Sequence, residues 1–125
     1  MVRYFRCAKC GNLVESVHSS GVPMVCCGEK RSELVPGSVD AAVEKHVPVV
    51  SVEGSTVKVH VGSVTHPMTE EHLIQWISLE TNRGVQRKAL SAGEAPEAVF
   101  ALADGEQAVA AYAYCNLHGL WKADC

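Results

Sequence analysis

The four cysteines near the start of the chain constrain its fold more than any other feature. Cys7 and Cys10 form a C-x-x-C pair, and Cys26 and Cys27 are adjacent. The segment that carries them, residues 1–36, is rich in glycine and turn-forming residues and has few large apolar side chains. A segment this short cannot stabilise a fold by burial alone, so we expect it to be held together by a metal ion.

Metal binding explains these cysteines better than disulfide bonds. The first seven residues lack the apolar stretch of a secretory signal, so a reducing cytoplasm is the expected compartment, where cysteine clusters usually bind metal. Four thiolates suit tetrahedral iron or zinc, and the spacing alone does not separate the two ions. Because consecutive side chains of an extended chain point in opposite directions, Cys26 and Cys27 are expected to distort the tetrahedron.

Residues 37–125 carry most of the apolar side chains and predict a folded β domain. Hydrophobic residues make up 47% of the whole chain, enough for a core. The net charge of −3 with no basic block argues against a nucleic-acid partner. No apolar run approaches the roughly 20 residues that cross a bilayer, so no membrane partner is expected either.

Alternating residues and regular turns predict an antiparallel β-sandwich in this second part. Val57, Val59 and Val61 share one face of a half-buried strand. The predicted strands are residues 47–52, 56–64, 72–80, 85–90, 98–103 and 107–114. The alanine-rich stretch 108–113 permits a helix, but its β-branched and aromatic neighbours favour a strand. One helical turn is predicted over residues 40–45, with Asp40 as its N-cap.

A second group of metal-ligand candidates lies at strand ends and in loops of this part, where a rigid β scaffold can direct side chains to one point. The candidates are His46, His66, His72, Cys115 and His118. A structural zinc site uses four ligands and a hydrolytic zinc site usually three. Five ligands in a square pyramid leave one octahedral position open, which suits iron acting on a small ligand. A thiolate opposite that position donates electron density to the iron.

Several motifs in one order make the chain resemble the desulfoferrodoxins, the two-iron superoxide reductases. They are C-x-x-C-G at 7–11, V-C-C-G at 25–28, E-K-H-V-P at 44–48, G-S-V-T-H-P-M at 62–68 and C-N-L-H-G-L-W-K at 115–122. The resemblance runs from end to end. It implies a desulforedoxin-like Fe(Cys)4 domain in residues 1–36 and an immunoglobulin-like, seven-stranded catalytic sandwich in residues 37–125, assembled as a homodimer.

The resemblance also implies a role for each candidate residue. Cys7, Cys10, Cys26 and Cys27 would bind the first iron. His46, His66, His72 and His118 would be the equatorial ligands of the second iron, with Cys115 axial. Glu44 would occupy the sixth position in the ferric resting state, and Lys45 would be a mobile cation near the open face. Cys125 has no place in the pattern.

The function implied by the resemblance is one-electron reduction of superoxide to hydrogen peroxide, with an electron donor such as rubredoxin. The alternative is a non-catalytic electron-transfer protein or a structural zinc- or iron-binding protein. Sequence leaves open whether the first iron relays electrons or only stabilises its domain.

Overall fold

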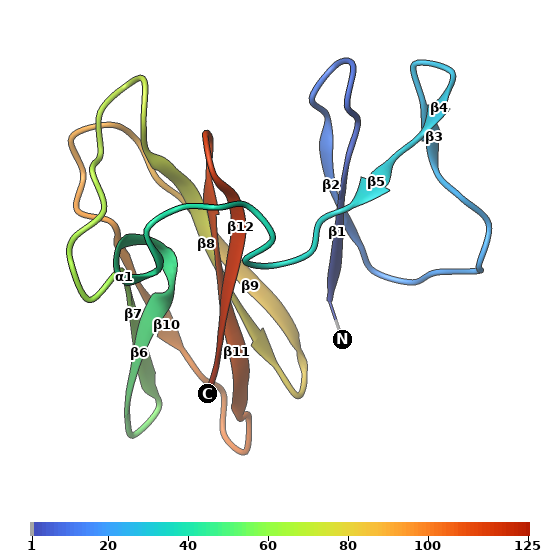
Figure 1. Cartoon of the computed structure of the whole chain (residues 1–125). Helices are drawn as coiled ribbons and strands as arrows, with labels where there is room; N and C mark the ends of the chain where they lie inside the picture. Colours follow the sequence, from blue (N-terminus) through green and yellow to red (C-terminus); the bar gives the residue numbers. More distant parts are fainter. Residues whose placement is uncertain (1) are drawn as a thin grey trace. The chain divides into compact units, whose positions relative to one another are not determined.

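The computed structural model describes residues 2–125, which form two compact units. The first unit ends at Val35 and the second runs from Pro36 to Cys125 (Figure 1). Both are built from antiparallel strands, and the only helix within residues 2–125 is a single turn. No helix in the described part of the chain is long and apolar enough to cross a membrane.

The first unit is a small β structure with almost no core. Its strands are β1 (Arg3–Arg6), β2 (Leu13–Ser16), β3 (Val25–Cys26), β4 (Glu29–Lys30) and β5 (Ser32–Glu33). Three of them form a sheet in the order β2-β1-β5, and β3 pairs with β4 as a separate hairpin. Only Tyr4 and Cys7 are buried among its described residues. This confirms that burial alone cannot hold the unit together.

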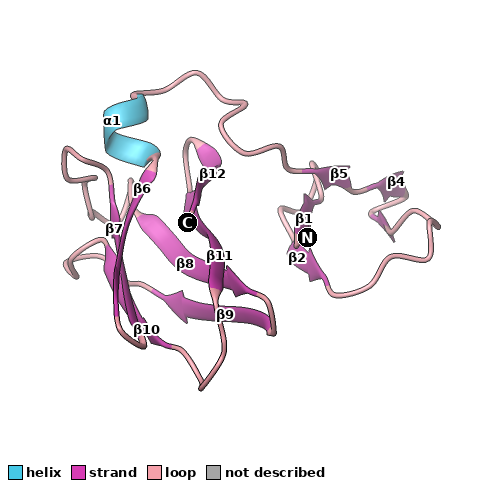
Figure 2. Ribbon diagram, turned by 90° about the horizontal axis from the view of Figure 1, so that it is seen from below, coloured by secondary structure: helices cyan, strands magenta, loops and turns pink. Residues whose placement is uncertain are grey.

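The second unit is a sandwich of two antiparallel sheets. The strands are β6 (Pro48–Glu53), β7 (Thr56–Val61), β8 (Ile74–Thr81), β9 (Gly84–Ala89), β10 (Glu97–Ala101), β11 (Ala108–Cys115) and β12 (Gly119–Asp124). One sheet has the order β10-β7-β6 and the other β12-β11-β8-β9. Figure 2 shows the two sheets as facing layers. The expected all-β architecture with a seven-stranded sandwich is thus confirmed.

The core lies between the two sheets and comes from alternate residues of their inner faces. Phe100 and Leu79 are among its largest fully buried side chains. Val57, Val59 and Val61 are all buried, as their alternation predicted. Side chains of both sheets meet in one cluster, which gives the strand ends a rigid base.

The helical turn differs from the prediction. Helix α1 spans Val43–His46 and starts after Ala42, whose extended backbone carries no capping side chain. The prediction of Asp40 as N-cap is therefore wrong, because the helix begins too late for that carboxylate to reach its first turn.

Strand β12 was also missed, because its residues lack a clear apolar alternation.

Candidate metal centres

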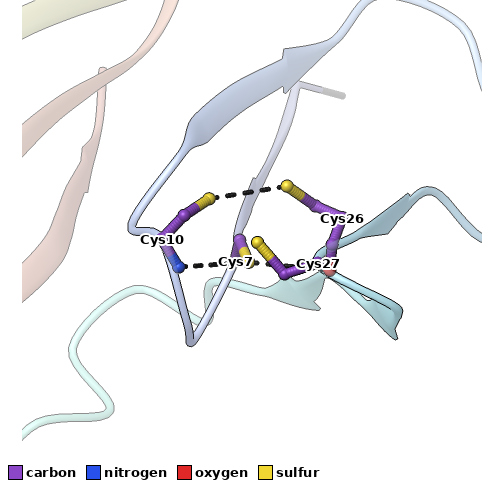
Figure 3. A group of neighbouring side chains, drawn as sticks. All are labelled: Cys7, Cys10, Cys26 and Cys27. Carbon is purple, nitrogen blue, oxygen red and sulfur yellow. Dashed lines mark hydrogen bonds between the residues drawn. The ribbon is translucent and has the colours of Figure 1, made fainter.

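The first centre gathers four cysteines from two hairpins. Cys7 and Cys10 come from the turn between β1 and β2, and Cys26 and Cys27 from the β3–β4 hairpin. Their sulfur atoms all lie within 4.8 Å of one another. The Sγ atoms of Cys10 and Cys26 are 3.5 Å apart, and Figure 3 shows the side chains converging. This is the spacing that one tetrahedral ion requires.

The adjacent cysteines reach the same point because the chain is not extended there. Cys27 has a φ of +54°, in the left-handed region, and Gly28 follows with a φ of +73°. This backbone turn directs the Cys27 side chain toward the sulfur of Cys26. The expectation of a distorted tetrahedron assumed an extended backbone, and that assumption is wrong.

Hydrogen bonds and neighbouring sulfurs control the charge of the first centre. The backbone N–H of Cys10 donates to Cys7 Sγ at 3.5 Å, and this bond is the largest cause lowering the pKa of Cys7 to about 6. The Arg31 guanidinium is the main cause lowering the pKa of Cys26. The sulfurs of Cys10, Cys7 and Cys26 raise the pKa of Cys27 to about 12. Four thiolates therefore coexist here only with a cation among them, so this donor set fits iron or zinc.

The second centre forms at one end of the sandwich because five strand ends meet there. In the antiparallel register β6 begins opposite the end of β7, and β8 begins opposite the end of β11. His46 precedes β6, and His66 follows β7. His72 precedes β8, Cys115 ends β11, and His118 lies in the turn to β12. The register thus brings together residues that are far apart in sequence.

In two of the histidines, Nδ1 is hydrogen-bonded to a backbone carbonyl oxygen. Nδ1 of His46 donates to the carbonyl oxygen of Ala42 at 2.7 Å, and Nδ1 of His66 donates to that of Pro67 at 2.6 Å. In the neutral rings, Nε2 is then a lone-pair acceptor. These two Nε2 atoms lie only 3.3 Å apart. Two lone pairs at that distance repel each other unless a cation lies between them, so the geometry fits a metal ion.

The other members of the candidate set complete the same group. Ligand atoms of His46, His66, His72 and Cys115 lie within 4.8 Å of one another. His118 Nδ1 lies beside this group, 3.1 Å from His46 Nε2 and 3.8 Å from Cys115 Sγ. Nε2 of His72 is buried and makes no hydrogen bond within the described residues. A buried acceptor without a partner is a further sign that an ion belongs there.

Burial keeps these groups in the state that binds metal. His46 and His66 are 2% and 1% exposed. Burial is the main cause lowering the pKa of both, to about 4 for His66, so the rings are neutral at pH 7. Burial likewise lowers the pKa of His72 and raises that of the Cys115 thiol. The chain thus offers imidazole lone pairs, and the metal itself must stabilise the Cys115 thiolate.

Glu44 and Lys45 are exposed in α1, immediately before His46. Burial is the main cause lowering the pKa of His46 and of His72, and the Lys45 charge is a smaller cause in the same direction. His60 hydrogen-bonds the carbonyl of Gly62 through Nδ1 at 3.0 Å and lies outside the metal-ligand group.

Sequence reasoning missed Asn116, which ties two ligand segments together. Its Oδ1 accepts a hydrogen bond from the N–H of Leu73 at 3.0 Å, and its Nδ2 donates to the carbonyl of Glu71 at 2.9 Å. These bonds flank His72 on both sides, while Asn116 itself follows Cys115. The only sequence signal was its place between two ligands of a C-x-x-H pair.

Gly62 is a second residue whose role emerges only in three dimensions. Its φ is +88°, and a Cβ added there would lie 2.2 Å from the carbonyl oxygen of Val64. The same Cβ would meet the carbonyl oxygens of Glu44 and Lys45 at 2.9 and 2.8 Å. Only glycine allows this turn to pack so closely against α1. The backbone of the Glu44–Lys45 pair is thereby held close to this turn, while both side chains are exposed.

Comparison with known families gives two matches that together span nearly the whole chain. Residues 38–124 match the family model described as Desulfoferrodoxin, and residues 2–33 match the Desulfoferrodoxin N-terminal domain. A desulfoferrodoxin of Syntrophotalea carbinolica is 48% identical over 120 residues, which cover 96% of this chain and 94% of the relative. A desulfoferrodoxin of Nitratidesulfovibrio vulgaris is 47% identical with the same coverage.

Solved structures agree with the sequence relatives. The superoxide reductase from Treponema pallidum superposes with a TM-score of 0.83 at 44% identity, covering 99% of both chains. The one-iron superoxide reductase from Giardia intestinalis has a TM-score of 0.57 at 35% identity, covering 66% of this chain and 97% of its own.

We expect Cys10→Ser to remove the metal of the first centre and unfold only the first unit. The unit has almost no core, so its hydrogen-bonded strands depend on the ion. Hydrogen exchange followed by mass spectrometry should show fast exchange in residues 3–33 and unchanged protection in residues 48–124. Cys125→Ser, which alters an exposed thiol outside both centres, is the control. Lost protection in the sandwich would contradict this prediction.

We expect Asn116→Ala to weaken metal binding at the second centre by about 10- to 100-fold, the usual effect of losing a partner that orients a ligand. Competition with a chelator measures the affinity. Asn82→Ala is the matched control, because the Asn82 side chain accepts a hydrogen bond from Gln107 in a turn away from the ligands. Equal affinities in both variants would show that Asn116 does not orient His72.

Proposed function

The chain belongs to the desulfoferrodoxin family, and we propose that it is a superoxide reductase, which converts superoxide to hydrogen peroxide. Each turnover adds one electron and two protons to the substrate, so no oxygen is released. The observation that carries this proposal is the convergence of four imidazoles and the buried Cys115 sulfur at one end of the sandwich, with the exposed Lys45 next to His46 in the chain.

We assign the two ligand sets to two iron ions. The first iron is held by Cys7, Cys10, Cys26 and Cys27, and the second by His46, His66, His72, His118 and Cys115. Iron held by the second set would supply the electron that reduces superoxide, and a set of five donors would leave room for one small ligand. The inward-facing lone pairs and the buried, unpartnered nitrogen of His72 support this assignment.

Lys45 attracts the substrate to the open position. Residues 36–125 contain eleven Asp and Glu side chains but only six Lys and Arg, so this unit as a whole repels an anion. A cation close to the reacting position offsets that repulsion locally and raises the rate of encounter. The electrostatic influence of Lys45 on His46 and His72 supports its placement near the open face.

Glu44 is assigned to the oxidised state of the centre. Its exposed carboxylate, two residues before the ligand His46, would be an additional oxygen ligand available to iron in that state. The Glu44 carbonyl accepts a hydrogen bond from the N–H of Val64 at 2.8 Å, so its backbone is fixed and only the exposed side chain has to move. Water held by Lys45, or bulk water at this exposed face, delivers the two protons.

The two units divide the work, with residues 1–36 as an Fe(Cys)4 domain and residues 37–125 as the catalytic domain. Every proposed ligand of the second iron lies in the catalytic domain, together with Glu44 and Lys45. An external one-electron donor such as rubredoxin is required, because each superoxide consumes one electron. We place the protein in the cytoplasm as a homodimer. Its free cysteines support a reducing compartment.

The function is tested by iron analysis, the visible spectrum and peroxide yield on superoxide. Wild-type protein should contain two irons per chain and show coloured thiolate bands. Cys115→Ser should abolish reductase activity and the band of the second centre while the first centre's bands persist. Cys125→Ser is the control and should change nothing. A colourless zinc protein, or normal peroxide production by Cys115→Ser, would overturn the proposal.

We expect Lys45→Ala to slow superoxide capture by about tenfold and to flatten its dependence on ionic strength. Salt screens such attraction over about 10 Å at 0.1 M. Glu44→Ala should leave capture nearly unchanged, because its carboxylate acts only after oxidation. Pulse radiolysis at several salt concentrations measures the rates. Lys58→Ala, an exposed lysine paired with Glu97, is the control. A capture defect confined to Glu44→Ala would reverse the two roles.

A further inference from the structure

One indole lies against the second centre without belonging to its ligand set. Trp121 is on β12 and is 4% exposed. Its ring lies 4.9 Å from the His46 ring between centroids, with an interplanar angle of 31°. Its Nε1 donates a hydrogen bond to the carbonyl oxygen of His118 at 3.0 Å. One side chain therefore contacts two ligands that lie 72 residues apart in sequence.

We propose that Trp121 is a positioning residue for the second metal centre, holding the His46 ring with its face and the His118 backbone with its N–H group. The proposal rests on the function proposed above and adds to it a residue that makes no bond to the metal. Nothing about the motif L-W-K distinguishes such a role from an ordinary core position, so it depends on the observed contacts.

The His46 ring has several neighbours that restrict its orientation. Its Nδ1 is bound to the Ala42 carbonyl, and its neighbours His66 and His118 meet it nearly perpendicularly, at 79° and 87°. Trp121 adds a large aromatic ring that lies against it at a tilt of 31°. A ring held in this way directs the Nε2 lone pair to one point, and a fixed lone-pair direction strengthens the metal bond.

The stack should be stronger when metal is bound than when it is absent. A metal ion draws electron density from the imidazole and makes the ring more positive. An indole face carries the negative side of an aromatic quadrupole and stabilises a neighbouring positive group. The contact therefore favours the metal-bound state over the metal-free state, beyond its contribution to folding.

The indole also has a second neighbour, the backbone at Gly37. The N–H of Gly37 donates to the carbonyl of Leu120 at 2.8 Å, next to Trp121 in the chain. A Cβ added at Gly37 would lie 3.8 Å from the indole ring, so this backbone passes close to Trp121. Together with its low exposure of 4%, this shows that the indole is packed within the unit as well as against the His46 ring.

Two variants separate the stacking contact from the hydrogen bond. Trp121→Leu removes both, whereas Trp121→Phe keeps an aromatic ring against His46 but loses the N–H donor. The measurement is the rate at which EDTA removes iron from the second centre of the full-length protein, followed by loss of its thiolate band. We expect a 10- to 100-fold faster release in Trp121→Leu and a smaller increase in Trp121→Phe.

Two controls distinguish positioning from a general loss of packing. Trp76→Leu removes an indole of the same kind, which stacks on Tyr114 at 5.7 Å between centroids, and should leave release unchanged. The first centre in the same molecules is an internal reference. Equal release rates in Trp121→Leu and wild type, or in Trp121→Leu and Trp76→Leu, would overturn the proposal. If Trp121→Leu does not fold, an unchanged rate in Trp121→Phe would overturn it.

This outcome is independent of the outcome for superoxide reduction. Peroxide yield of the wild-type protein tests the proposed function, and iron release tests the role of Trp121. A wild-type protein without reductase activity but with Trp121-dependent iron release would reject the function and keep the positioning role.

Discussion

The second centre depends on hydrogen bonds that face away from it. The carbonyls of Ala42 and Pro67 bind the Nδ1 protons of His46 and His66, so both rings present lone pairs inward. Burial prevents protonation from relieving the repulsion between them. A metal ion satisfies these converging lone pairs together, so folding of the sandwich forms the binding site before the metal is bound.

The antiparallel register brings these ligands together. A local shift in that register at the end of β11 lies at the ligand Cys115. Cys115 is paired with Ile74, whereas its neighbour Tyr114 is paired with Trp76, so the register shifts by one residue at the end of β11. Such bulges bend a strand and redirect a side chain. Here the shift coincides with the residue that supplies the thiolate, and Asn116 then fastens the following turn to the segment around His72.

Sequence located the cysteine group and the strands, because paired cysteines and alternating valines are patterns of neighbouring residues. The six predicted strands match β6–β11 with shifted ends, since alternation is a property of neighbours. The close contacts of Gly62 and the bonds of Asn116 could not be predicted, because they depend on residues distant in sequence. The turn at Cys27 is local, since Cys27 and Gly28 connect the paired residues Cys26 and Glu29, but an extended backbone was assumed there. Asp40 failed as a cap because the helix starts at Val43, after the extended residue Ala42.

The two proposed iron centres have net charges of opposite sign. This difference explains why one centre attracts superoxide and the other does not. Four thiolates around ferrous or ferric iron leave a net negative charge, which the N–H of Cys10 and the Arg31 side chain only soften. Such a centre repels an anion and has no open position. Four neutral imidazoles and one thiolate around ferrous iron leave a net positive charge instead, and the role proposed for Lys45 is to add to it. The different ligand charges therefore allow one chain to hold two irons, of which only the second attracts superoxide.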